Sequence, residues 1–176
     1  PDSVTTIRYW AFASCDSLTN VTIPASVTSI GEHAFSYCDS LTELIVDEDN
    51  QYYSSDEFGV LFDKDKTTLI KYPQGNIRTS YTIPNGVTTI DEYAFSFCKN
   101  LINVTIPDTL DDTVSGFGLG EEAFKNCSPL EEIVIGSKLT TISKGAFENC
   151  EDLEYIFIPD NVLYVCDNAF KNNTSA

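Results

Sequence analysis

Residues 18–38 read LTNVTIPASVTSIGEHAFSYC, and the order of their apolar side chains recurs along almost the whole chain. Ala34-Phe35 in this stretch lies 23 residues after Ala11-Phe12. The same Ala-Phe pair begins at Ala11, Ala34, Ala94, Ala123, Ala146 and Ala169, and a cysteine follows the Phe by three residues at Cys15, Cys38, Cys98, Cys127 and Cys150. A constant period of this length predicts coils stacked into a solenoid, in which each repeat contacts only its neighbours.

The first half of each unit has the alternation of a short strand. Leu18, Val21 and Ile23 are spaced as LxxLxL, and the two-residue step between Val21 and Ile23 is a strand period. Pro24 ends the run, because proline cannot donate a hydrogen bond to a ladder and favours a turn. We therefore expect one short parallel strand in each repeat, with these three side chains pointing inward.

The second half of the unit predicts a short extended segment followed by a compact turn. Val27 and Ile30 are β-branched and three residues apart, which favours extended backbone. Residues 31–38 then place an Ala, a Phe and a Cys at positions i, i+1 and i+4, so two of them share one face at helical spacing. This spacing predicts one or two helical turns.

The pattern LxxVxIPxxVTxIGxxAFxxC resembles the repeat of BspA-like leucine-rich-repeat proteins, a family of bacterial and protozoan surface proteins. The proline, the Ile-Gly, the Ala-Phe and the cysteine all recur in phase. The resemblance implies an α/β solenoid: a right-handed leucine-rich-repeat superhelix with a concave parallel β-sheet and short convex strands or helical turns. It supplies no catalytic motif. We expect residues 1–176 to form a single leucine-rich-repeat domain with a continuous core, and to be a fragment of a longer chain.

Two segments interrupt the period and predict insertions. Ala34 and Ala94 are 60 residues apart, and the excess falls at about residues 47–77. There, β-rich runs at 59–62 and 68–72 flank a polar turn at 63–67, which predicts a protruding β-hairpin whose second strand is a candidate for the concave sheet. The next repeat strand is expected at 81–83. A second insertion, at about 111–118, reads DDTVSGFG and predicts an acidic loop.

The charge of the chain limits its partners. A net charge of −17 would repel nucleic acid and anionic membrane surfaces. No apolar run is long enough to span a bilayer, so we expect no membrane insertion in this fragment. Proteins, or as the alternative glycans, remain as partners.

Candidate catalytic and metal-binding residues do not form a recognisable motif. The five in-phase cysteines predict a column of free, buried thiols and not disulfides. The single histidine, His33, occupies a variable slot and has no Cys or His partner for zinc. The pairs Glu131-Glu132 and Asp111-Asp112 predict a solvated acidic surface, with acid-base work on a glycan as the alternative. The acidic runs 47–50 and 63–65 lack the Gly and distal Glu of a calcium loop. We expect no cofactor.

The resulting hypothesis is a non-catalytic recognition or adhesion module, extracellular or on the cell surface, that binds host, matrix or partner proteins. The alternatives are a structural spacer that displays another domain, or a polysaccharide-active β-solenoid enzyme. Strand alternation places the residues between the inward positions on the concave face. The predicted binding residues are Asn20, Thr22, Glu43, Ile45, Ser80, Thr82, Asn103, Thr105, Glu132, Val134, Tyr155 and Phe157.

Overall fold

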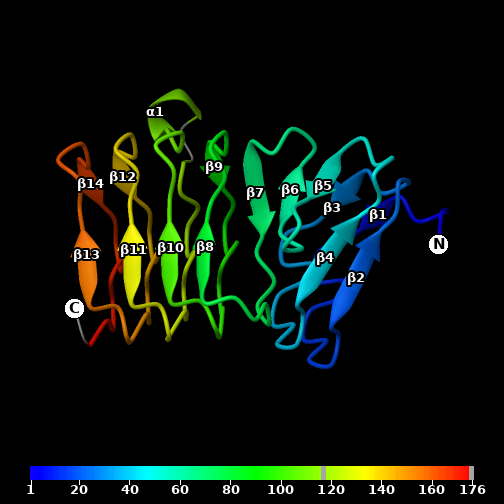
Figure 1. Cartoon of the computed structure of the whole chain (residues 1–176), viewed down its shortest axis with the longest axis horizontal. Helices are drawn as coiled ribbons and strands as arrows, with labels where there is room; N and C mark the ends of the chain where they lie inside the picture. Colours follow the sequence, from blue (N-terminus) through cyan, green and yellow to red (C-terminus); the bar gives the residue numbers. More distant parts are fainter. Residues whose placement is uncertain (116–117, 175–176) are drawn as a thin grey trace.

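The computed structural model describes residues 1–115 and 118–174 and shows a β-solenoid of about seven coils. The coils lie side by side from the N-terminal to the C-terminal end of the molecule (Figure 1). Each regular coil contains a long strand, a turn, a two-residue strand and a second set of turns that leads to the next coil. No helix in the described part of the chain is long and apolar enough to cross a membrane.

The long strands pair in parallel at the positions expected from the LxxLxL spacing. They are β2 (Asn20–Ile23), β4 (Glu43–Val46), β8 (Ser80–Thr82), β10 (Asn103–Thr105), β11 (Glu132–Val134) and β13 (Tyr155–Phe157). They form two sheets, one containing β2 and β4 and the other ordered β13-β11-β10-β8. We call the surface that these strands share the long-strand face.

The short strands are formed by the Val-Thr-x-Ile segments and by the corresponding residues LTTI at 139–142 and VLYV at 162–165. These are β1 (Thr6–Ile7), β3 (Ser29–Ile30), β9 (Thr89–Ile90), β12 (Thr141–Ile142) and β14 (Tyr164–Val165). β1 pairs with β3 and β12 with β14, both in parallel. The last residue of each of these segments is apolar, and Ile90 and Ile142 at this position are fully buried in the core.

The expected helical turns at 31–38 are wrong. This segment is a series of turns in which His33 and Tyr37 have left-handed backbone, with φ of 56° and 57°. Within it, the backbone N–H groups of Ala34 and Ser36 donate three residues back, to Gly31 and His33, as in turns. Between coils, the backbone N–H of Phe12 donates to the carbonyl of Ala34 at 2.8 Å, and the same bond recurs from Phe124 to Ala146 in later coils. The only helix in the described part of the chain is α1 (Asp112–Ser115), at the edge of the solenoid (Figure 1).

The second expected insertion is therefore partly helical. α1 occupies the middle of the 111–118 segment, and residues 116 and 117 lie outside the described part of the chain. The short helix arises because Asp111 caps it: its carboxylate accepts the backbone N–H of Thr113 at 3.0 Å.

Aromatic side chains stack through the interior. Phe124 lies between Phe95 and Phe147, with ring centroids 4.5 and 5.3 Å away. The buried apolar side chains of the regular coils include Leu41, Leu44, Phe95, Ile106, Phe124, Ile135 and Phe147. Val46 is only half-buried, because the chain leaves the regular coil immediately after it.

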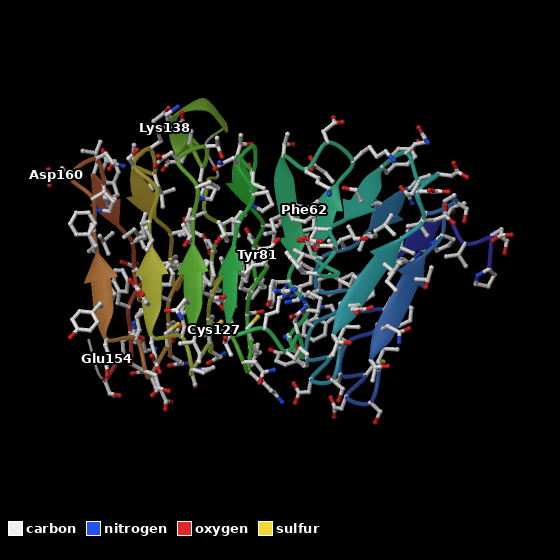
Figure 2. All side chains as sticks on the ribbon, in the orientation of Figure 1. Phe62, Tyr81, Cys127, Lys138, Glu154 and Asp160 are labelled. Atoms are coloured by element: carbon white, nitrogen blue, oxygen red, sulfur yellow. The ribbon has the colours of Figure 1, made fainter. Side chains whose placement is uncertain are left out.

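The first insertion forms a three-stranded antiparallel meander of β5 (Tyr53–Ser55), β6 (Leu61–Asp63) and β7 (Thr68–Lys71). The predicted hairpin is thus present, but its expected protrusion is wrong. Leu61, Phe62 and Leu69 are fully buried, because their side chains fill the solenoid interior. Phe62 is labelled there, near Tyr81, in Figure 2.

β7, the second strand of the predicted hairpin, pairs with a short strand. The expectation that it is a candidate for the concave sheet of long strands is therefore wrong. β7 pairs in parallel with β9, with Leu69 opposite Ile90. The backbone N–H of Tyr72 then donates to Ala94 at 2.8 Å, as the Phe of a regular coil does. Lys71-Tyr72 therefore takes the place of Ala-Phe in this coil.

The meander divides both the long-strand sheet and the core. Between β4 and β8 the backbone N–H of Leu44 donates to the carbonyl of Gly59, and the Tyr81 hydroxyl donates to Asp56 at 2.7 Å. The buried side chains form two clusters that meet at β6, with Leu61 in one cluster and Phe62 in the other. The expectation of one continuous core is wrong at this point, and β2 and β4 are tilted relative to the later long strands (Figure 1).

All six cysteines are free thiols. Of the five in-phase cysteines, Cys38, Cys98, Cys127 and Cys150 are buried as predicted, whereas Cys15 in the first coil is only half-buried. The thiols of Cys38, Cys127 and Cys150 donate to main-chain carbonyls of a neighbouring coil, at 3.0, 3.0 and 3.2 Å. They close the turns of adjacent coils; Cys127 is labelled in Figure 2. Burial raises the pKa of Cys98 and Cys150 well above the ordinary value of a thiol.

Candidate functional site

The long-strand face presents every side chain that strand alternation predicts. In β10, for example, Val104 is buried while Asn103 and Thr105 on either side of it are exposed. All twelve predicted binding residues are exposed. Alternation along a pleated strand is sufficient to explain this placement.

Parallel pairing without a register shift arranges these residues in rows. In the four-stranded sheet, one row contains Ser80, Asn103, Glu132 and Tyr155, and the other contains Thr82, Thr105, Val134 and Phe157. In the two-stranded sheet, Asn20 lies opposite Glu43 and Thr22 lies opposite Ile45. Because the meander separates β4 from β8, the twelve residues form two surfaces and not one array.

The apolar part of the longer surface lies at its C-terminal end. Tyr155 and Phe157 are each 74% exposed, and Val134 beside Phe157 is 48% exposed. Glu132 lies beside Tyr155 and supplies a carboxylate. We call Glu132, Val134, Tyr155 and Phe157 the β11/β13 patch.

Of the two acidic pairs, Asp111-Asp112 accepts hydrogen bonds within the protein and Glu131-Glu132 is exposed. Asp112 accepts hydrogen bonds from the backbone N–H and the hydroxyl of Thr140, both at 2.9 Å. Two hydrogen bonds from Thr113 lower the pKa of Asp111. Glu131 and Glu132 are exposed.

The two acidic runs considered for calcium stabilise turns. Asp47 accepts the backbone N–H of Asp49 at 3.0 Å, and Asp63 accepts those of Thr67 and Thr68 at 2.7 and 2.9 Å. Within residues 1–115 and 118–174, no group of three or more His, Cys, Asp or Glu side chains is arranged to hold a metal ion.

A second surface, which strand alternation does not reveal, lies on the turns of the N-terminal half. Trp10, His33 and Tyr93 each precede the Ala-Phe position of their coil, and their rings form a row with centroids 5.2 Å (Trp10 to His33) and 4.5 Å (His33 to Tyr93) apart. Tyr37 and Phe97, two residues after the Phe, form a parallel row at 4.8 Å. We call these five residues the aromatic ridge.

The aromatic ridge could have been found by aligning the variable slots of the repeat. The slot before Ala-Phe contains Trp10, His33 and Tyr93 in three of the first four coils, whereas later coils have Glu122, Gly145 and Asn168 there. Comparing this slot between coils shows the aromatic side chains. His33 is half-buried against Tyr93, which belongs to the coil after next. The intervening third coil has Ile70, and not an aromatic residue, in this slot.

A cleft of about 170 Å³ lies beside the ridge, where Ile70 and Lys71 of the meander replace a regular turn. Its walls include Glu32 and His33 on one side and Asp91, Glu92 and Tyr93 on the other. Lys71 is buried and donates from Nζ to the carbonyl of Tyr93 at 2.9 Å. Burial lowers the pKa of Lys71.

Two carboxyl groups of the cleft, those of Asp91 and Glu92, have raised pKa values. Burial raises the pKa of Asp91, with a smaller contribution from Glu32. Burial also raises the pKa of Glu92, followed by repulsion from Glu121, Glu32 and Asp91. A second hollow of about 350 Å³, on the side of the short strands, shares Asp91 and Glu92 with this cleft.

The stacked parallel strands, the in-phase leucines and the buried cysteine column define a leucine-rich-repeat solenoid. The pattern of the BspA type leucine rich repeat region matches residues 1–76 and 72–176, and the chain belongs to this family. A comparison with curated proteins gave no significant match.

Two solved structures are similar in both sequence and fold. A leucine rich cell surface protein from Faecalibacterium prausnitzii A2-165 is 34% identical, with a TM-score of 0.86 over 99% of this chain and 44% of that chain. The pneumococcal vaccine antigen PcpA is 32% identical, with a TM-score of 0.83 over 92% of this chain and 38% of that chain. The chain thus spans less than half the length of these two proteins. A leucine rich repeat protein of T. pallidum, 22% identical with a TM-score of 0.58 over 92% of this chain and 67% of that chain, shares the fold.

Proposed function

We propose that this chain is a non-catalytic recognition or adhesion module, displayed outside the cell or on its surface, which binds a partner protein through the β11/β13 patch. The observation that carries the proposal is the exposure of two adjacent aromatic rings, Tyr155 and Phe157, on a regular sheet surface. Membership of a family with cell-surface relatives supports the location.

The chemistry of the patch suits a protein surface. Aromatic rings bring a large apolar area with few rotatable bonds, and exposed apolar patches with a polar rim mark interaction sites. The polar rim lies on the β10 side, where Asn103 is beside Glu132 and Thr105 is beside Val134. An open sheet surface with exposed rows of side chains fits a folded partner better than a small substrate, which requires a concave pocket.

The test uses the full-length protein with Tyr155→Ser and Phe157→Ser together. Partners from host or matrix extract are captured on the unaltered protein and identified by mass spectrometry, and the affinity of the purified partner is then measured by surface plasmon resonance. We expect the double variant to bind at least about tenfold more weakly, since an aromatic residue that acts as a hot spot contributes about 2 kcal/mol or more. The control is Tyr52→Ser with Ile77→Ser, which removes two exposed apolar side chains elsewhere.

Unchanged affinity in the Tyr155/Phe157 variant, with an unaltered circular dichroism spectrum, would remove the patch from the binding surface. If deletion of residues 1–176 from the full-length protein leaves partner binding intact, the region is a spacer. Both results would contradict the proposal.

A further inference from the structure

The aromatic ridge occupies left-handed backbone positions, where residues with a lower conformational free-energy cost are found in other coils. Trp10, Tyr37, Tyr93 and Phe97 have φ between 57° and 62°. Left-handed backbone costs roughly 1–2 kcal/mol for a residue with a bulky side chain, and Gly or Asn adopt it more readily. The equivalent positions of the C-terminal coils are Glu122, Gly145 and Asn168 before the Ala-Phe pair and Asn126, Asn149 and Asn172 after it, so all but Glu122 are Gly or Asn and none is aromatic. The solenoid therefore does not require aromatic residues in these slots.

Stacking between the rings offsets only part of this cost. Each aromatic pair contributes about 0.5–1.5 kcal/mol beyond its buried area. Trp10 and Tyr37 nevertheless remain 40% exposed, so much of their surface lies open to solvent. In the C-terminal half the same row is an asparagine ladder, in which Asn172 donates to Asn149 at 2.7 Å and Asn149 donates to Asn126. The ladder links the turns of successive coils by side-chain hydrogen bonds and exposes no apolar rings.

The carboxylates of the cleft beside the ridge also differ from those of the C-terminal half in their ion pairs. There, Lys125 pairs with Glu122 and Glu148 at 2.8 and 3.1 Å, and Lys171 pairs with Glu148 at 3.2 Å. In the part of the chain that the structure describes, Glu32, Asp91 and Glu92 form no ion pair. The one cation in their cleft, Lys71, directs its amino group to the carbonyl of Tyr93.

We propose that the aromatic ridge and the adjoining cleft form a docking surface for an extended basic segment of a partner protein, with arginine side chains over the rings and against Glu32 and Glu92. Guanidinium groups stack on aromatic faces and pair with carboxylates, so a single arginine satisfies both features of this surface. A neutral glycan could stack on the rings but would leave the three carboxylates without a counter-charge. The surface lies on the turns and is independent of the β11/β13 patch.

The test uses the whole chain and a blocked Gly-Arg-Gly-Arg-Gly peptide as the probe. The chain has a single tryptophan, Trp10, so its fluorescence reports events at the ridge. The matched peptide control replaces both arginines by citrulline, which has nearly the same shape without the charge. We expect the arginine peptide to change the Trp10 emission and the citrulline peptide to leave it unchanged.

Two variants with equal net charge separate local docking from general attraction to an acidic protein. Glu32→Gln with Glu92→Gln removes two cleft carboxylates, and Glu131→Gln with Glu154→Gln removes two exposed carboxylates from the C-terminal half, where Glu154 is labelled in Figure 2. Isothermal titration calorimetry at physiological salt should show about tenfold weaker binding of the arginine peptide to the cleft variant. The remote variant should bind as the unaltered chain does.

Equal weakening in the two variants would overturn the proposal, because it would indicate only long-range attraction. Absence of any response to the arginine peptide would do the same. If a linear oligosaccharide such as cellohexaose changes the Trp10 emission and the peptide does not, the ridge is a glycan site and the basic-segment proposal is wrong. Unchanged melting temperatures of both variants would show that the fold is intact in these comparisons.

Discussion

At the scale of single residues, the solenoid depends on a few positions where a neighbouring coil leaves no room for a side chain. Gly59 is the clearest of these, because it has a φ of 72° and lies against β4. A Cβ added at Gly59 would come within 2.7 Å of the Cα of Glu43. The contact is with main chain, so it cannot be relieved by rotating a side chain.

Gly59→Ala should therefore reduce the free energy of unfolding by about 3 kcal/mol, combining left-handed strain with overpacking. Urea unfolding followed by circular dichroism measures the effect. Gly86→Ala is the matched control, since Gly86 has a φ of 113° but nothing within 4 Å of the added Cβ. Equal losses in the two variants would show that backbone strain alone, and not the contact with β4, determines the effect.

At the scale of elements, the meander is joined to the regular coils by buried asparagine side chains. Asn50 is fully buried, and its Nδ2 donates to the carbonyls of Pro24 and Val27, both at 2.9 Å. Its Oδ1 accepts the backbone N–H groups of Tyr52 and Tyr53, both at 2.8 Å. The side chain thus replaces the hydrogen bonds that a regular turn would make at the start of β5.

Asn50→Asp tests this role with almost no change in shape. The carboxylate can still accept the two N–H groups, but it faces the carbonyls of Pro24 and Val27 without a proton to donate. We expect a loss of at least about 3 kcal/mol in the free energy of unfolding at neutral pH, because a buried donor is replaced by a charge. Asn85→Asp, at an exposed position, should change stability little. A small effect at position 50 would mean that the coil does not depend on these bonds.

The regular elements could be predicted from the sequence, and the insertion could be predicted only in part. The period and the inward spacing of Val104 and Ile133 are sufficient to predict the parallel register of β10 and β11. The sheet to which β7 belongs could not be predicted, because the run Thr-Leu-Ile-Lys alternates equally well in either sheet. The Ala-Phe-x-x-Cys spacing also fits a helix, which is excluded by the left-handed backbone of His33 and Tyr37 and by the hydrogen bonds to the neighbouring coil.

The candidate site was predictable to a similar extent. The outward positions of the long strands follow from alternation, but the separation of Ile45 from Thr82 follows from the path of residues 56–59, which no periodic pattern contains. The cleft beside Tyr93 arises from the third coil, where Lys71 stands in place of the usual alanine. Both features come from the irregular coil.

At the scale of the whole molecule, the in-phase stacking of coils buries a column of cysteine thiols away from solvent. Cys98 and Cys150 are 1% and 0% exposed, and burial is the main cause of their raised pKa values. Burial, together with the charge of Asp56 and the hydrogen bond to it, also raises the pKa of Tyr81. These groups remain neutral in the native state at pH values where they would ionise in an unfolded chain.

The pH dependence of stability follows from this difference. Above the ordinary thiol pKa of 9.0, the unfolded chain releases protons that the native state retains. The unfolded state then binds fewer protons, so the free energy of unfolding falls as the pH rises, by about 1.4 kcal/mol per thiol for each pH unit. We expect a marked loss of stability between pH 8 and pH 10, measured by urea unfolding at each pH.

Repulsion within a chain of net charge −17 would also destabilise the protein at high pH, and the two causes can be separated. Cys98→Ala with Cys150→Ala removes two buried thiols without changing the charge of the native state, so its stability should decline less steeply between pH 8 and pH 10. Added salt screens surface repulsion but not the ionisation of groups that are buried in the native state. If the double variant and the unaltered chain lose stability equally, and salt abolishes the loss in both, repulsion and not the buried column determines the alkaline limit of this solenoid.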